Sequence, residues 1–233
     1  MGEEATAAGM RGIPIPERPC VLFDFDGTLA DTKPGIVSVA RQVLAEFGMT
    51  EEQMGDLGRL VGPPFPKAFT MIYGVSPDEA ERIGARYHDV YEALGPETHP
   101  LFPGIDALLR SLVTHGRRLA VATSKGQDMA LRFMADDGID DVFEVVAGKT
   151  DPAHSDKASL VARALRELGC VPGEAVMVGD RLYDVEGAHA NGVPCVGAYL
   201  GGTAPAGELE RAGADVVVRS VAELGSVLMG SHA

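Results

Sequence analysis

The sequence predicts an α/β fold in which a parallel sheet is interrupted, after its first strand, by an all-helical insertion. First, short apolar segments alternate with amphipathic helical segments from about residue 100 onward, a pattern typical of parallel sheets with helices on both faces. Second, an apolar strand at 20–25 precedes this series and is separated from it by about 65 residues that contain no clear strand. Third, 45% of the residues are hydrophobic and 23% are charged, as in ordinary globular domains.

The predicted core begins with the strand at 20–25 and continues beyond Pro103 and Gly104 as alternating helices and strands. Apolar residues recur with helical spacing at 105–115, 126–137, 156–168, 182–191 and 221–229. Strands are expected at 118–122, 143–147, 175–178, 193–198 and 215–218. This succession indicates a Rossmann-like core made of residues 18–32 and 100–233.

The insertion, residues 33–99, is expected to form a separate helical domain. Gly and Pro residues divide it into helical stretches at 35–48, 51–60, 64–73 and 77–94. Residues 1–17 show no hydrophobic periodicity and are expected to be a disordered arm.

The composition restricts the partners and the compartment. A formal net charge of −14 argues against a nucleic acid or an anionic membrane, although a local cation or a metal could still admit a small anionic substrate. Neither a signal peptide nor an apolar run of about 20 residues is seen. The three cysteines form no C-x-x-C pair, which indicates a reducing compartment and no zinc site. We therefore expect a cytoplasmic protein, monomeric or homodimeric.

Polar side chains follow three of the predicted strands, at the ends where parallel sheets bind ligands. In chain order they are Asp24, Asp26, Thr123, Ser124, Asp180 and Asp184. Two carboxylates at alternate positions behind an apolar strand repel each other and are costly to desolvate, and a divalent cation would offset both effects. Some of these residues also have structural explanations, since Thr123 and Ser124 could cap a helix and Asp184 could complement a helix dipole.

Lys157 is expected in the first turn of the helix at 156–168. A cation there faces the positive end of the helix dipole, at a cost of about 0.3–1 kcal/mol, which a bound anion would offset. Its removal is therefore expected not to lower thermal stability. The alternatives are a solvated lysine beside Asp156, or Lys149 in the same functional role.

Four segments resemble the motifs of the haloacid dehalogenase superfamily, the aspartate-nucleophile phosphatases. In order they are DFDGTLADT, VATS, the segment around Lys157, and VGDRLYD. The helical insertion resembles the cap domain of that family. The segments DTKPGI, GPPF and FPGIDALL are most similar to the phosphoglycolate phosphatase branch.

The resemblance implies a Mg²⁺-dependent phosphomonoester hydrolase that acts on a small phosphorylated metabolite through an aspartyl-phosphate. Asp24 would be the nucleophile and Asp26 the general acid and base. Lys157 would neutralise the nucleophile and the transferred phosphoryl group.

The remaining implied roles concern the metal and the substrate. The metal would be held by Asp24, the Asp26 backbone carbonyl and Asp180, with Asp184 holding a metal-bound water or an outer ligand. Phosphoryl oxygens would be bound by Thr123 and by the Ser124 N–H at a helix start, and Gly27 would bring the backbone close to the phosphate. From the cap, Arg59 would reach the substrate.

Several functions remain open. The lysine segment lacks the Lys-Pro pair expected of a close phosphoglycolate phosphatase, so a 5′-nucleotidase-like phosphatase is an alternative. A phosphomutase of the β-phosphoglucomutase type would share every core residue and differ only in its cap. A non-catalytic binding module is disfavoured by the intact Asp24, Asp26, Lys157 and Asp180.

Overall fold

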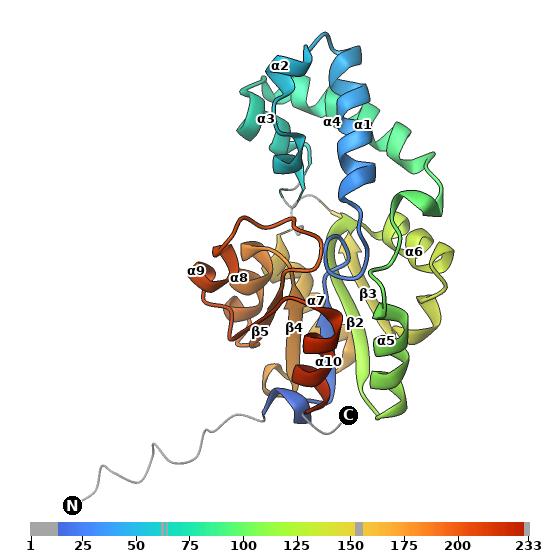
Figure 1. Ribbon diagram of the computed structural model, residues 1–233, viewed down its shortest axis with the longest axis vertical. Helices are drawn as coiled ribbons and strands as arrows, with labels where there is room; N and C mark the ends of the chain where they lie inside the picture. The colour runs from blue at the N-terminus through green and yellow to red at the C-terminus, as the bar shows by residue number, and fades with distance from the viewer. Residues whose placement is uncertain (1–13, 62, 64, 152–155, 231–233) are drawn as a thin grey trace, which may run out of the picture.

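The core is a six-stranded, fully parallel sheet with the strand order β3-β2-β1-β4-β5-β6 (Figure 1). A computed structural model describes residues 14–61, 63, 65–151 and 156–230. The strands are β1 Cys20–Phe23, β2 Arg118–Gly126, β3 Val145–Lys149, β4 Ala175–Gly179, β5 Cys195–Ala198 and β6 Val216–Val218. The predicted α/β fold with a parallel sheet is confirmed.

Helices cover both faces of the sheet, which explains why its central strands are apolar throughout. In β1, Val21 and Phe23 face the hydrophobic cluster that includes residues of α5 (Ile105–Thr114), α6 (Gln127–Asp136) and α10 (Val221–Met229). Leu22 faces the opposite cluster, with residues of α7 (Lys157–Leu168), α8 (Leu182–Ala190) and α9 (Glu208–Ala212). Neighbouring residues of a strand point to opposite faces, so a strand covered on both sides must be hydrophobic at every position.

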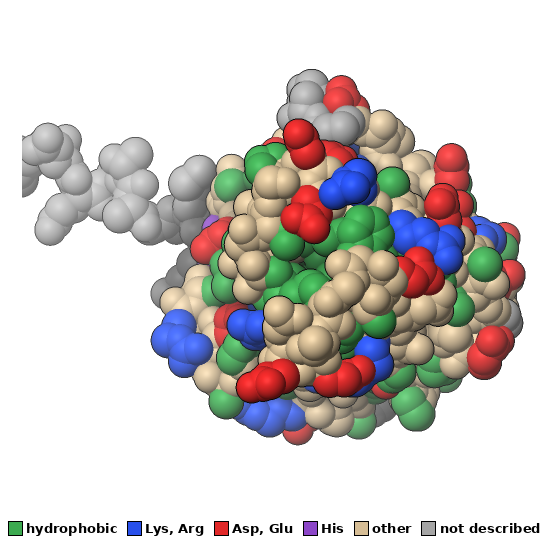
Figure 2. Space-filling view, turned by 90° about the horizontal axis from the view of Figure 1, so that it is seen from above, with side chains coloured by type: hydrophobic (Ala, Val, Ile, Leu, Met, Phe, Trp, Pro, Cys, Tyr) green, Lys and Arg blue, Asp and Glu red, His purple; other side chains and the backbone are tan. Residues whose placement is uncertain are grey.

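The helical insertion lies beyond one end of the sheet (Figure 1). Its elements are α1 Lys33–Glu46, α2 Glu51–Met54, the 3-10 helix η2 Leu57–Leu60, α3 Lys67–Tyr73, α4 Pro77–Glu92 and the 3-10 helix η3 Pro96–Thr98. Figure 2 looks down on this cap, whose outer surface carries acidic and basic side chains around hydrophobic ones. In the cap, Arg86 is exposed and pairs with Glu46 at 2.7 Å, as expected of a solvated helix face.

The two chain segments that connect core and cap run side by side. The N–H of Asp31 donates to the Pro100 carbonyl at 2.8 Å, and the N–H of Phe102 donates to the Leu29 carbonyl at 3.0 Å. These hydrogen bonds lie next to the predicted limits of the cap at 33 and 99. They form a two-stranded connection that brings both ends of the insertion to the carboxyl end of β1.

The strand order fixes where a ligand can bind. From β1 the chain builds the sheet outward through β2 and β3 and then returns to the other side of β1 with β4. The strands β1 and β4 are neighbours, but the chain continues from β1 toward one edge of the sheet and from β4 toward the other. The segments that follow these two strands therefore separate from each other. In open α/β sheets such a switch point forms a crevice at the carboxyl ends of the strands, where ligands bind.

Several local predictions were wrong. The helix expected at 51–60 is split into α2 and η2, because Gly55 takes a positive φ of 56°. The strand expected at 118–122 continues to Gly126, so Thr123 and Ser124 are not at a helix start. The helix α9 was not predicted. Of the arm expected at 1–17, residues 1–13 lie outside the described part of the chain, whereas Ile15–Glu17 form a 3-10 turn that packs against α10.

The cysteine pattern was also misread. Cys20 and Cys170 form a disulfide with a Cα–Cα distance of 6.8 Å, and Cys195 is free and buried. The bridged residues are 150 positions apart, so spacing along the chain could not reveal the pair. The inference of a reducing compartment loses its basis. Among the described residues, no helix combines the length and the apolar character needed to cross a membrane.

Candidate active site

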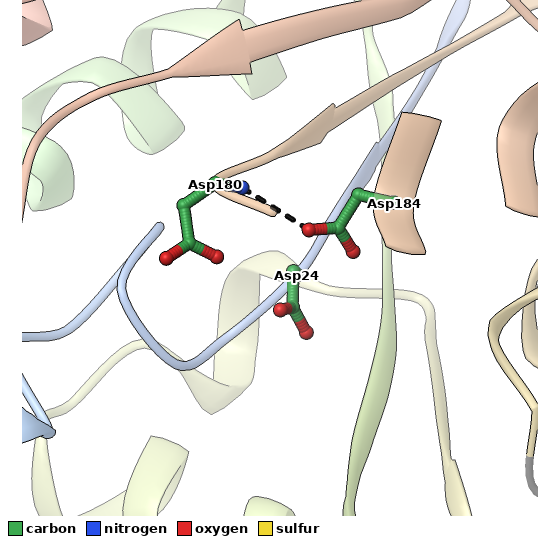
Figure 3. Close-up of side chains that lie close together, drawn as sticks. All are labelled: Asp24, Asp180 and Asp184. Carbon is green, nitrogen blue, oxygen red and sulfur yellow. Dashed lines mark hydrogen bonds between the residues drawn. The ribbon is translucent and has the colours of Figure 1, made fainter. Parts of the chain in front are cut away.

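Three carboxylates meet at the switch point of the sheet. Asp24 follows β1, Asp180 follows β4, and Asp184 lies in the first turn of α8. Figure 3 shows the three side chains close together, and one oxygen of each lies within 4.8 Å of the others. All three residues are buried. Buried like charges at this separation require a compensating cation.

Asp184 is held by the start of its own helix. Its Oδ2 accepts hydrogen bonds from the N–H of Asp180 at 3.1 Å and from the N–H of Arg181 at 3.0 Å. The first of these bonds is the dashed line in Figure 3. The carboxylate thus accepts from backbone N–H groups that have no partner within the helix. This agrees with the structural explanation that Asp184 complements the dipole of its helix. Its other oxygen, Oδ1, faces the ammonium of Lys157 at 2.7 Å.

Lys157 supplies the nearest cation of the chain to this cluster. Its Nζ lies 2.9 Å from Asp24 Oδ1 and 2.7 Å from Asp184 Oδ1, and it donates to the Ala122 carbonyl at 3.1 Å. The side chain is only 6% exposed, which excludes a solvated surface lysine. Close packing of α8 on α7 fixes its path, since a Cβ at Gly187 would come within 2.7 Å of Lys157 Cγ.

Lys149, the competing lysine, does not reach the carboxylates. Its Nζ donates to the backbone carbonyl of Phe65 at 3.2 Å, so it joins the end of β3 to the cap. Arg181 makes a similar connection, from its guanidinium to the Val61 carbonyl. Both residues hold the cap against the core. Neither contact was identified from the sequence, because the partners are backbone atoms that no side-chain pattern reveals.

The ionisation of the cluster reflects its burial. Desolvation is the main cause that raises the pKa of Asp24 to about 6, and the nearby Lys157 opposes it. Burial, followed by the charges of Asp184 and Asp24, raises the pKa of Asp180 well above its usual value. For Lys157, burial would lower the pKa, but Asp184 and Asp24 hold it above the ordinary value. Without a further cation, the cluster holds carboxylates that resist ionisation.

The cluster fits a hard divalent cation. Asp180 Oδ1 is buried and has no hydrogen-bond partner among the described residues, whereas Oδ2 accepts from the Thr203 hydroxyl. Mg²⁺ prefers oxygen ligands such as carboxylates. Here carboxylate oxygens of Asp24, Asp180 and Asp184 lie close together, and Asp180 Oδ1 lacks another partner among the described residues. An Mg²⁺ ion at this point would supply the charge that Lys157 alone does not.

The turn after β1 keeps Asp26 apart from this cluster. The Asp26 side chain is 22% exposed, against 11% for Asp24. Gly27 has a φ of +77°, and a Cβ there would lie 2.2 Å from Asp180 Oδ2. Its N–H donates to the Ala30 carbonyl at 2.9 Å. Gly27 thus forms a tight turn, and its missing side chain makes room for Asp180. Its own amide is occupied, and the approach of this backbone to a phosphate stays a prediction.

Thr123 and Ser124 lie at the far end of β2, beside the cluster. Thr123 is buried, and its Oγ1 accepts from the N–H of Lys125 at 3.2 Å. Since α6 begins only at Gln127, the helix-cap explanation does not hold for Thr123 or Ser124. The expectation that the Ser124 N–H lies at a helix start was therefore wrong. Both residues line the cavity above Asp24.

The cavity has a volume of about 590 Å³ and lies between core and cap. Its floor includes Asp24, Asp26, Thr123, Lys157, Asp180 and Asp184. Its roof includes Tyr87, His88, Tyr91 and Glu92 of α4. A cavity of this size is typical of small-molecule sites. The expectation for Arg59 was wrong, because this residue is exposed, does not line the cavity, and directs its guanidinium to the Asp56 carbonyl at 3.1 Å.

The family model of the haloacid dehalogenase-like hydrolases matches residues 21–198. The chain belongs to this family. The resemblance carried by the four motifs is thereby confirmed, and in such a hydrolase the buried carboxylates after β1 and β4 are the candidate reaction centre.

Individual relatives of this haloacid dehalogenase-like hydrolase carry different names. It is 43% identical over 178 residues to the tyrosine-protein kinase PtkA of Mycobacterium tuberculosis, a match that covers 76% of this chain and 60% of PtkA. It is 33% identical over 184 residues to a 5′-nucleotidase of Pseudomonas aeruginosa, covering 78% of this chain and 83% of the nucleotidase. A phosphoglycolate phosphatase of Caulobacter vibrioides is 32% identical over 206 residues, 86% of each chain.

Among solved structures, a predicted phosphatase from Clostridium acetobutylicum superposes with a TM-score of 0.84 at 34% identity. The match covers 90% of this chain and 97% of the other. The fold therefore extends over nearly the whole of both chains.

The raised pKa values predict how the metal-free protein responds to pH. Asp24 binds its proton more tightly in the folded state (pKa about 6) than in an unfolded chain (3.8), so stability should fall as pH rises from about 4 to 7. The expected loss from this group alone is on the order of 3 kcal/mol. Asp180 acts in the same direction.

Thermal unfolding in EDTA between pH 5 and pH 8 tests this prediction. Asp180→Asn removes one ionisable group of the cluster and should lose less stability over that range than the wild type. Saturating Mg²⁺ should reduce the pH dependence of the wild type. An equal loss of stability with pH in the variant and the wild type would contradict the prediction that Asp180 is a buried carboxylate with a raised pKa.

Proposed function

We propose that the protein is a Mg²⁺-dependent phosphomonoester hydrolase that acts on a small phosphorylated metabolite through an aspartyl-phosphate on Asp24. One observation carries the proposal: Asp24, the ammonium of Lys157 and two further carboxylates converge at the floor of the cavity between core and cap. A carboxylate beside a fixed cation at the floor of such a cavity is what an attack on phosphorus requires. Family membership and relatives named as phosphatases support it.

In the proposed reaction, Asp24 attacks phosphorus and Asp26 gives a proton to the oxygen of the leaving alcohol. Asp26 then takes a proton from the water that hydrolyses the aspartyl-phosphate, which returns both carboxylates to their first state. Lys157 keeps Asp24 oriented and faces the negative charge of the transferred group. Thr123 and Ser124, which line the cavity next to Asp24, are positioned to bind phosphoryl oxygens.

Mg²⁺ would be held by Asp24, Asp180 and the Asp26 carbonyl, with Asp184 as a ligand or as the acceptor for a metal-bound water. When bound, it would neutralise charge on the phosphoryl oxygens. The chain itself contributes the buried carboxylates and the packing that holds them. Asp184 is fixed by two backbone N–H groups and Asp180 by Thr203, so the ligand oxygens are oriented in advance.

The substrate we propose is a small ester, because the cavity lies between core and cap and the core residues Lys149 and Arg181 bond to a loop of the cap. Phosphoglycolate is the first candidate, and a 5′-nucleotide is the second. The roof favours neither by charge alone, since it combines His88 with the carboxylate of Glu92. A phosphomutase remains the third candidate, since it would use the same core.

The experiment that tests the proposal is phosphate release from p-nitrophenyl phosphate and from a panel that contains phosphoglycolate, nucleoside 5′-monophosphates and hexose phosphates. We expect release with Mg²⁺ and none after EDTA, with recovery when Mg²⁺ is restored. Turnover that persists in chelator would exclude the metal assignment. Interconversion of β-glucose 1-phosphate and glucose 6-phosphate without phosphate release would favour the mutase.

A further inference from the structure

A second buried lysine, Lys125, lies beside the other aspartate of the first motif. It follows Thr123 by two residues on β2, and its side chain is 5% exposed. The Nζ atom lies 3.1 Å from Asp26 Oδ1 and 3.9 Å from Met129 Sδ. An ammonium group is costly to bury unless it is paired, so the contact with Asp26 is what makes this position tolerable for a lysine.

Aromatic rings form the rest of its surroundings. The ammonium lies 4.8 Å from the ring centroid of Phe133 and 4.9 Å from that of Tyr91, with Phe25 at 6.0 Å. Faces of aromatic rings attract cations at these distances. Phe133 belongs to α6 of the core, whereas Tyr91 belongs to α4 of the cap. Lys125 is thus in contact with the core, the cap and the carboxylate of Asp26.

Asp26 has a specific need for such a partner. Its side chain is the more exposed of the two first-motif aspartates, at 22% against 11%. It also lies on a turn, away from the hydrogen bonds that fix Asp184. A carboxylate with this freedom would spend part of its time turned to solvent. A general acid acts only when it lies within hydrogen-bond reach of the leaving oxygen.

We propose that Lys125 is a positioning residue for Asp26: its ammonium holds the carboxylate in the cavity, and Tyr91 of the cap holds the ammonium. The inference rests on the proposed phosphatase function. Proton transfer is then aligned only when the cap ring covers Lys125. The competing explanations are that Lys125 contacts the substrate directly, since it also lines the cavity, or that it only stabilises the fold.

Two aryl esters of nearly equal shape separate these explanations. p-Nitrophenyl phosphate has a good leaving group and needs little protonation, whereas phenyl phosphate depends on the general acid. Lys125→Met keeps the length of the side chain and its packing against the rings. We expect it to lower kcat for phenyl phosphate about 10-fold more than kcat for p-nitrophenyl phosphate, with KM changed less than about 2-fold for either.

Two further variants complete the test. In an Asp26→Asn background, Lys125→Met should cost less than about 2-fold, because residues that act as a unit are not additive. Tyr91→Leu keeps both charged residues and should show the same preference for the activated ester, at roughly 3-fold. If Lys125→Met does not fold, the Tyr91→Leu variant alone tests whether Lys125 positions Asp26.

The outcomes are distinct. Equal losses on both esters would overturn the inference in favour of a structural role, and a rise in KM alone would assign Lys125 to the substrate. An undiminished effect of Lys125→Met in the Asp26→Asn background would also overturn it. A folded wild-type protein that hydrolyses neither ester with Mg²⁺ would overturn the proposed function, and the inference with it.

Discussion

Asp24→Asn should form no phosphoenzyme and release no phosphate from any ester. The amide has no competent attacking oxygen, and it also removes a carboxylate from the group formed with Asp180 and Asp184. The protein should nevertheless fold. Asp24 is buried with a pKa raised to about 6, so its neutral form is well tolerated, and the amide is a close mimic of that form. Stability of the metal-free variant at pH 8 should equal or exceed that of the wild type.

Asp26→Asn should behave differently, because it keeps the nucleophile and the backbone carbonyl. It loses proton transfer in both half-reactions, a loss of about 10²–10⁴ in rate for an unactivated ester. An activated aryl ester needs little protonation, so it should still phosphorylate Asp24. Hydrolysis of the intermediate still needs a base for the water, and it should lag.

Rapid-quench mass spectrometry with p-nitrophenyl phosphate distinguishes the two aspartates. We expect a phosphate adduct on Asp24 in the Asp26→Asn protein, and no adduct in the Asp24→Asn protein. An adduct on Asp26, or one that persists in Asp24→Asn, would mean that the two roles are exchanged. Circular dichroism of both variants serves as the control for folding.

The fold was predictable because its signals are local. Each core strand is a short apolar run, and each helix between strands has an apolar face, such as the buried Leu160, Val161, Ala164 and Leu168 of α7. Where the prediction failed, the decisive interaction was not in the local pattern. The disulfide joins residues 150 positions apart, and α9 has only five residues. The division of 51–60 depends on the conformation of one glycine.

The residues of the candidate site also differ in whether a local pattern in the sequence could reveal them. Asp24, Asp180 and Asp184 were predictable, because topology brings the carboxyl ends of parallel strands to one edge of the sheet. Lys125 and Arg181 were not, since each acts through a contact between core and cap that only the folded chain creates. Arg59 was misassigned for the converse reason. The sequence does not show where the side chain of a basic residue beside a turn is directed, and here it bonds to the Asp56 carbonyl and does not line the cavity.

Removal of the Lys157 ammonium should have two effects, and the structure reverses the expectation for the second. Lys157→Met should lower kcat/KM at least ~10²-fold, as the loss of one fixed electrostatic stabiliser does. From the sequence we expected no loss of thermal stability, because only the helix dipole was considered. In the folded chain the ammonium lies 2.9 Å from Asp24 and 2.7 Å from Asp184, so its loss leaves buried carboxylates without their cation.

The metal-free Lys157→Met protein should therefore be less stable than the wild type at pH 8, by roughly 3–5 kcal/mol. Its pKa is held above the ordinary lysine value, so Lys157 stays charged from pH 5 to pH 8 and its own titration does not contribute in that window. Asp24, with a pKa of about 6, becomes largely protonated at pH 5, where the missing cation matters less. The difference in free energy of unfolding between variant and wild type should accordingly shrink from pH 8 to pH 5.

Denaturant unfolding in EDTA at the two pH values measures this difference, and Lys149→Met is the matched control. Lys149 is also a lysine of the cavity wall, but its ammonium bonds to the Phe65 carbonyl, whereas Asp24 and Asp184 pair with Lys157. Its removal should lower stability by the same small amount at both pH values. A Lys157→Met protein whose deficit is equally independent of pH would show that the ammonium does not compensate the Asp24 and Asp184 carboxylates, and the electrostatic account of the site would fail with it.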